Sequence, residues 1–171
     1  MTAAADPASE PDFLYFGYGS NLDIDRLHEN CPSARLVLPA RLADHRLAFT
    51  RKSELKWHGG VADILPAPGD EVWGAVWAID GEHSRALDEQ EGLFRDPPGY
   101  KRYPVTVTTE GGDEITCRCY RVVAPDPQGF APSPAYKATL LRGAHALALP
   151  AHYIAALEAI EDNGYAEGEP G

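Results

Sequence analysis

Residues 15–22 read Tyr15-Phe16-Gly17-Tyr18-Gly19-Ser20-Asn21-Leu22, and a stretch with helical spacing, residues 23–30, follows at once. Apolar residues open this run and glycine with small polar residues closes it, which is typical of a buried strand that turns into a helix. Glycine lets a backbone approach a ligand closely, and unpaired N–H groups at a helix start attract a carboxylate or a phosphate. The run therefore predicts the floor of an anion-binding pocket, with an ordinary helix cap as the alternative interpretation.

The length of 171 residues suits a single domain with one hydrophobic core. We expect that domain to span residues 13–165, between flexible tails at 1–12 and 166–171 that lack a core pattern. Residues 1–12 also have neither the basic start nor the apolar run of a signal peptide or membrane span.

The charge balance limits the partners of the protein. There are 26 acidic residues against 15 Lys and Arg, a formal net charge of −11, which argues against binding to nucleic acid or to an anionic membrane. A local cationic or N–H-lined pocket for a small anionic substrate stays compatible with this charge.

The cysteines indicate a reducing compartment. Cys31, Cys117 and Cys119 are odd in number and too few for a disulfide framework, so we expect a cytoplasmic protein. Cys117 and Cys119 lie two residues apart on an alternating run and therefore share one face of a strand. No histidine stands at ligand spacing beside them, and we expect buried structural thiols rather than a metal site.

Strand patterns outnumber helical ones between the expected tails. Strands are expected at 13–18, as two strands around Pro39 within 36–50, at 60–65 and at 71–79, and as a hairpin of 103–109 and 114–123. Helices are expected at 23–30, from near Gly81 to the run that ends at Gly92, at 135–148 and at 150–160. Trp73 and Trp77 share a face of the clearest strand, and we expect both to pack in the core. The pattern predicts an α+β domain, a small mixed-strand β-barrel with flanking helices.

A second candidate for chemistry is the run Leu87-Asp88-Glu89-Gln90-Glu91-Gly92. At about 100° per residue, Glu91 lies close to the direction of the apolar Leu87, whereas Asp88 is turned away from it. A carboxylate at a helix C-terminus capped by Gly92 faces the negative end of the helix dipole, and partial burial also raises its pKa. Glu91 is thus a candidate general acid and base, the alternative being a structural ion pair.

Taken in order, these motifs resemble the γ-glutamylcyclotransferase family, in particular the animal cytosolic enzyme, over roughly residues 13–165. Besides the two runs quoted above, the resemblance rests on Trp57-His58-Gly59-Gly60, Pro68-Gly69-Asp70-Glu71-Val72-Trp73-Gly74, Glu114-Ile115-Thr116-Cys117-Arg118 and Pro132-Ser133-Pro134-Ala135-Tyr136-Lys137. The chain departs from the family pattern at Gly17, where alanine is common, and in a longer loop before Tyr100.

The resemblance implies a small β-barrel with helices and an enzyme that cyclises γ-glutamyl compounds to 5-oxoproline and releases an amino acid. It implies that Glu91 is the catalytic residue and that no metal or cofactor takes part. The substrate-binding residues that it implies are Tyr15, Phe16, Gly17, Tyr18, Gly19, Ser20, Tyr100 and Tyr136.

Three questions stay open at this point. The leaving group can be an amino acid or peptide, an amine, or part of a γ-glutamyl-protected biosynthetic intermediate. The fold can also serve a non-catalytic binding module, against which the presence of Glu91 argues. The expected partner is a small γ-glutamyl substrate, and a homodimer is one of the oligomeric states that the sequence allows.

Overall fold

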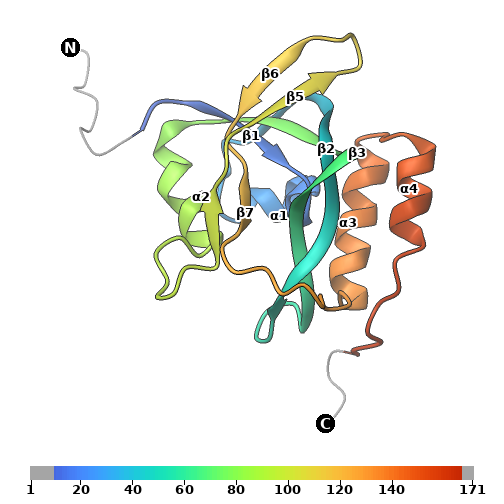
Figure 1. The fold of residues 1–171 in the computed structure, drawn as a ribbon. Coiled ribbons are helices and arrows are strands. Elements are labelled where there is room, and N and C mark those ends of the chain that lie inside the picture. The colour runs from blue at the N-terminus through green and yellow to red at the C-terminus, as the bar shows by residue number, and fades with distance from the viewer. Residues whose placement is uncertain (1–9, 167–171) are drawn as a thin grey trace, which may run out of the picture.

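The fold is organised around one long antiparallel hairpin, made of β2 (Arg35–Ser53) and β3 (Gly59–Ile79), in the computed structural model of residues 10–166 (Figure 1). The prediction of separate strands divided at Pro39 and before residue 71 is wrong, because both strands run on without interruption. The breaks in the sequence pattern are absorbed by shifts of register between Leu36 and Leu38, Ala43 and His45, and Ala48 and Arg51. Such bulges bend a strand without ending it.

The hairpin is the centre of a five-stranded sheet with the order β1-β3-β2-β5-β6. Its other strands are β1 (Phe13–Gly17), β5 (Val105–Thr109) and β6 (Glu114–Cys117), and a second sheet pairs β4 (Tyr100–Arg102) with β7 (Tyr120–Val122). The strand pairs are antiparallel, and one isolated parallel bridge joins Tyr15 to Arg118. The predicted α+β class is confirmed, and the strongly curved sheet stays open instead of closing into a barrel.

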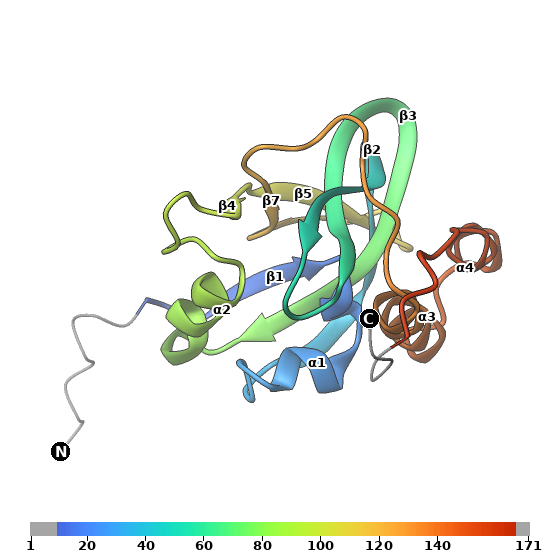
Figure 2. The same ribbon diagram turned by 90° about the horizontal axis from the view of Figure 1, so that it is seen from below.

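Short helices flank this sheet at both ends. They are α1 (Ile24–His28), α2 (Ser84–Gln90), α3 (Pro134–Ala146) and α4 (Ala151–Glu158), with single 3₁₀ turns η1 (Ser20–Leu22) and η2 (Gly81–His83). Seen from below, α3 and α4 lie side by side at one end of the sheet and α2 lies at the other (Figure 2). The end of β1 and the turn η1 lie between them, so residues 15–22 are central in the fold.

Helix α3 packs unusually close to that central run. A β-carbon built at Gly143 would lie 2.5 Å from the backbone carbon of Leu22, so only glycine permits this contact. At the start of the helix, the Ser133 hydroxyl accepts a hydrogen bond from the Tyr136 N–H at 3.2 Å. The N-cap and the close contact together place Tyr136 beside the turn η1.

The ends of the expected domain lie near the limits of the described residues. Most of the expected tails, residues 1–9 and 167–171, falls outside the described residues. Glu10 contacts Ser84 and forms ion pairs with Arg102 and Arg118, at 3.0 and 2.7 Å. Within residues 10–166, no helix has the length and apolar character needed to cross a membrane.

Candidate functional site

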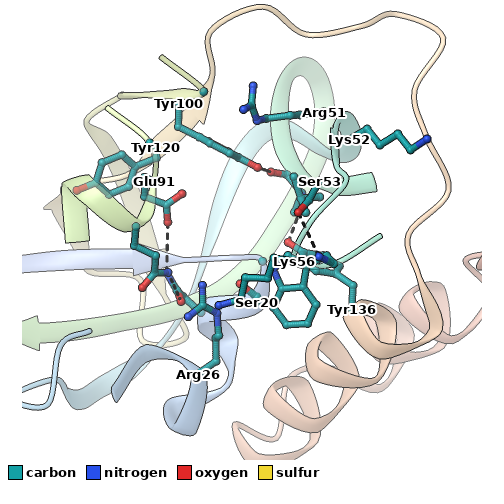
Figure 3. A pocket seen from close by; sticks show the side chains of 18 of the residues that line it. Ser20, Arg26, Arg51, Lys52, Ser53, Lys56, Glu91, Tyr100, Tyr120 and Tyr136 are labelled. Atoms are coloured by element: carbon teal, nitrogen blue, oxygen red, sulfur yellow. Dashed lines mark hydrogen bonds between the residues drawn. The ribbon is translucent and has the colours of Figure 1, made fainter. Parts of the chain in front are cut away.

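A cavity of about 450 Å³ opens between the end of β1, the C-terminus of α2 and the turn that joins β2 to β3 (Figure 3). Its floor consists of the end of β1 and the turn η1, together with aromatic side chains from four other segments of the chain. The lining of this floor and the adjoining wall includes Tyr15, Tyr18, Gly19, Ser20, Asn21, Trp57, Ala62, Gln90, Glu91, Tyr100, Tyr120 and Tyr136.

Glu91 enters the cavity from the end of helix α2. It is the C-cap residue, and its N–H donates to the Leu87 carbonyl at 3.0 Å. Gly92 follows with a φ of +75°, a left-handed conformation that suits glycine and ends the helix. The carboxylate therefore lies at the negative end of the helix dipole, as the sequence predicted.

The surroundings of Glu91 favour its protonated form. Burial raises the pKa of the carboxyl to about 7, the negative charge of Asp88 adds to this rise, and the Arg26 guanidinium opposes it. A carboxyl group with a pKa near neutrality can both accept a proton and return it during one reaction. Glu91 thus has the electrostatics of a general acid and base.

Asn21 connects Glu91 to the floor of the cavity, and the predicted set of site residues did not include it. Its buried side-chain amide donates to the Tyr15 hydroxyl at 2.9 Å and to the Glu91 carboxylate at 3.4 Å. Its amide oxygen accepts from Gln90 at 3.1 Å, and its backbone carbonyl accepts from the Trp77 indole at 3.0 Å. The conformation of Asn21 is therefore held from four sides, and the amide helps to orient the carboxylate.

Tyrosine hydroxyls form the rest of the polar wall. The Tyr136 hydroxyl accepts from the Ala62 N–H at 3.0 Å, and the Tyr100 hydroxyl donates to the Ala62 carbonyl at 2.6 Å. The Tyr18 hydroxyl donates to the Tyr120 carbonyl at 2.7 Å. Burial raises the pKa of Tyr18 and Tyr100, and that of Tyr136 to about 12, so these groups stay neutral and serve as hydrogen-bonding groups.

The structure brings together most of the predicted site residues, with two exceptions. Phe16 and Gly17 do not line the cavity. The Phe16 side chain is fully buried in the core, and Gly17 packs so closely that an added β-carbon would lie 2.9 Å from the Asn21 carbonyl oxygen. The residues that do line it are Glu91, Tyr15, Tyr18, Gly19, Ser20, Tyr100 and Tyr136.

Asp88 shows where the helical-wheel argument failed. It was expected to turn away from the interior, yet it is buried: its carboxylate pairs with Arg102 at 2.6 Å and accepts from the Tyr120 hydroxyl at 2.6 Å. Strands β4 and β7 cover this side of α2, so the helix has two buried faces. Asp88 belongs to an ion-pair network behind the cavity and not to its lining.

The cysteines are buried and reduced. Cys31, Cys117 and Cys119 are free thiols, and burial raises the pKa of Cys31 and of Cys117 to about 11. Among the described residues 10–166, no group of three or more His, Cys, Asp or Glu side chains is arranged to hold a metal ion.

Comparisons with known proteins agree on one family. The model of the AIG2-like family matches residues 71–157. Gamma-glutamylcyclotransferase from Homo sapiens is 44% identical over 159 residues, which covers 91% of this chain and 82% of that protein, and the protein of the same name from Bos taurus is 44% identical over 156 residues, covering 90% and 81%. A solved structure described as gamma-glutamyl cyclotransferase has a TM-score of 0.86 and 42% sequence identity, and the match covers 94% of each chain.

Proposed function

The chain belongs to the γ-glutamylcyclotransferase family, and we propose that its cavity performs the cyclisation of γ-glutamyl amino acids and peptides with Glu91 as general acid and base. It is an enzyme of this kind, and its products are 5-oxoproline and the released amino acid or peptide. The proposed role of Glu91 is supported by one observation: its carboxyl group, with a pKa raised to about 7, lies beside the turn of Gly19 to Asn21 in the same cavity.

The charges of the substrate's γ-glutamyl group are complementary to the groups at the cavity floor. Its α-carboxylate suits the glycine-containing turn, where backbone N–H groups meet an anion without a side chain in the way. Its α-ammonium suits the neighbourhood of Glu91, whose negative charge favours a cation. In this placement the γ-carbonyl comes within reach of the substrate's own nitrogen, since the ring to be formed has five members.

The reaction then needs only one proton carrier. Glu91 takes a proton from the α-ammonium, and the freed amine attacks the γ-carbonyl carbon to form the ring bond. The developing oxyanion is stabilised by hydrogen-bond donors of the floor. Protonated Glu91 gives its proton to the leaving nitrogen, and the bond between that nitrogen and the γ-carbon breaks as the carbonyl re-forms. The ring nitrogen then passes its second proton through Glu91 to the departing amine, which leaves as an ammonium. Atoms and charge balance without a co-reactant, and the protein contributes by holding the folded conformer of the substrate.

The pH dependence of kcat/KM should follow Glu91 on the acid side. Because the pKa of the carboxyl is raised to about 7, the base form is lost as the pH falls below that value. We expect kcat/KM to fall about tenfold per pH unit below about pH 6. This decrease of kcat/KM on the acid side is measured from initial rates between pH 5 and 8.5. Circular dichroism confirms that the protein stays folded over the same range. An apparent pKa near 4.5 would contradict the proposed role.

Gly19 should tolerate no side chain. An added β-carbon would lie 2.9 Å from the Tyr136 hydroxyl and 3.0 Å from the Ala62 β-carbon. We expect Gly19→Ala to displace the floor and raise KM by about 10- to 100-fold, with a smaller effect on kcat. Gly111→Ala is the matched control, because a β-carbon there meets only the Thr109 hydroxyl at 3.8 Å.

The direct test of the proposed function is the release of 5-oxoproline. Purified protein is incubated with γ-glutamyl dipeptides, a γ-glutamyl amine and glutathione, and the product is quantified by chromatography. Release from dipeptides supports the function. Absence of 5-oxoproline from every substrate overturns it.

We further infer that the enzyme acts in the cytoplasm on small molecules. Three free, buried cysteines support a reducing compartment, and the net charge of −11 argues against nucleic acid as a partner. A fluorescent fusion of the full chain tests the location, and light scattering after gel filtration decides whether the protein is a homodimer.

A further inference from the structure

The mouth of the cavity is cationic although the protein is acidic. Two acidic side chains, Glu54 and Glu91, stand among the lining residues, whereas five lining side chains are cationic: Arg26, Arg51, Lys52, Lys56 and Arg95. The chain as a whole has a net charge of −11. A positive cleft on a negative molecule concentrates anionic ligands in that cleft.

Two of these cations are already neutralised in part. The Arg26 guanidinium pairs with Glu29 at 2.7 Å, and the Lys56 ammonium lies 3.6 Å from the same carboxylate. Arg51, Lys52 and Arg95 differ from them, because within residues 10–166 no carboxylate lies within 4.0 Å of their charged groups. Figure 3 shows Lys52 pointing away from the cavity, on the other side of β2 from Arg51, so Arg51 and Arg95 are the cations of this group that are available to a ligand.

Arg51 has the best-defined position of the three. It is half-buried near the end of β2, and its guanidinium packs on the backbone of Gly99. A β-carbon at Gly99 would lie 2.9 Å from the central guanidinium carbon, so the absence of a side chain at this position makes room for Arg51. In Figure 3, Arg51 lies above Tyr100, on the opposite side of that ring from Tyr136. The guanidinium is thus held at the rim, between the β2–β3 turn and the loop of residues 92–99.

The leaving group must lie at this rim. When the γ-glutamyl group occupies the floor, with its ammonium at Glu91 and its carboxylate at the Gly19 turn, the other side of the γ-amide bond points toward the mouth. The end of β2 and the loop of residues 92–99, which carry Arg51 and Arg95, form that part of the cavity.

We propose that Arg51, assisted by Arg95, forms a carboxylate subsite for the leaving group. The enzyme accordingly prefers γ-glutamyl substrates whose leaving group is an acidic amino acid, accepts neutral amino acids less well, and turns over γ-glutamyl amines least. The inference rests on the proposed function. Guanidinium binds carboxylates through paired hydrogen bonds. Because the rim is partly exposed to solvent, this ion pair contributes only modestly to the binding free energy.

The experiment compares three substrates that differ only in the leaving group: γ-glutamylglutamate, γ-glutamylalanine and γ-glutamylethylamide. For Arg51→Gln, we expect kcat/KM to fall about 5- to 20-fold with γ-glutamylglutamate and less than about 2-fold with the ethylamide. Gly99→Ala, which keeps the charge but pushes the guanidinium away, should give the same selective loss. Arg46→Gln removes the same charge from an exposed position on β2 outside the cavity and should change none of the three values.

A salt titration tests independently whether the preference for an acidic leaving group is electrostatic. Raising the ionic strength from about 20 mM to about 200 mM should reduce the wild-type preference for γ-glutamylglutamate over the ethylamide, because screening weakens attraction at an exposed rim. Equal losses with all three substrates in Arg51→Gln, or no loss with any, would overturn the subsite. Equal wild-type turnover of the three would overturn the subsite while leaving the cyclisation intact, whereas a wild-type protein that releases no 5-oxoproline would overturn both.

Discussion

We expect Glu91→Gln to lower kcat by about two to four orders of magnitude while the protein still folds and binds its substrate. Glutamine preserves the size of the side chain and can keep the contact with Asn21, but it cannot take the proton of the α-ammonium. The measurement is the initial rate of 5-oxoproline release, together with substrate binding by calorimetry. Turnover near that of the wild type would remove Glu91 from the mechanism.

The thermal stability of the same variant tests the raised pKa of Glu91 independently. A carboxyl whose folded pKa is raised from 4.5 to about 7 destabilises the folded state as the pH rises through this window, because the unfolded chain ionises more readily. Glu91→Gln removes this cost, so its Tm at pH 8 should equal or exceed that of the wild type. Glu89→Gln is the matched control: Glu89 lies on the exposed side of the same helix, paired with Arg85 at 3.2 Å, and its loss should leave kcat unchanged.

The second large effect is expected at Asn21. Asn21→Ala removes the amide that contacts Tyr15, Gln90 and Glu91, and we expect kcat to fall about 10- to 100-fold. Buried partners left without hydrogen bonds should lower the free energy of unfolding by about 1–3 kcal/mol. Since the amide donates to the ionised form of Glu91, its loss should also move the acid limb of kcat/KM to higher pH.

Asn30→Ala separates this role from a general loss of packing. The Asn30 amide donates to the same Gln90 side chain, at 2.8 Å, but it does not line the cavity. This variant should keep the wild-type pH profile. If Asn21→Ala also keeps it and loses only stability, Asn21 does not position Glu91.

The parts of the site that could be predicted from the sequence depend on neighbours in the chain. Gly19 and Ser20 end a buried strand and begin a turn, and Gly92 ends a helix, so local backbone preferences were enough to indicate a pocket floor and an inward carboxylate at Glu91. The hairpin of β5 and β6 is similar, since its turn contains Gly112 with a φ of +90°. The prediction of one strand over 114–123 is wrong, because β6 ends at Cys117 and β7 pairs with β4 in the second sheet.

The errors have a common cause in contacts between distant segments. Bulges opposite β3 carry β2 past Pro39, and strands β4 and β7 bury Asp88 on a face of α2 that the helical wheel assigned to solvent. Arg51 reaches the mouth because the loop of residues 92–99 leaves room for it at Gly99. Periodicity describes one element at a time and contains no information about which other element covers it.

The sequence alone thus specifies the two parts of the proposed site, the turn at Gly19 and the carboxyl of Glu91, because each is encoded within a few residues. Only the tertiary structure brings these two parts together. Asn21 and Glu91 are 70 residues apart in the chain, and they come within hydrogen-bonding distance because β1 pairs with β3 and the chain then returns through α2. The pKa near 7 and the cationic mouth arise in the same way, since burial and the field of distant charges exist only once the chain has folded.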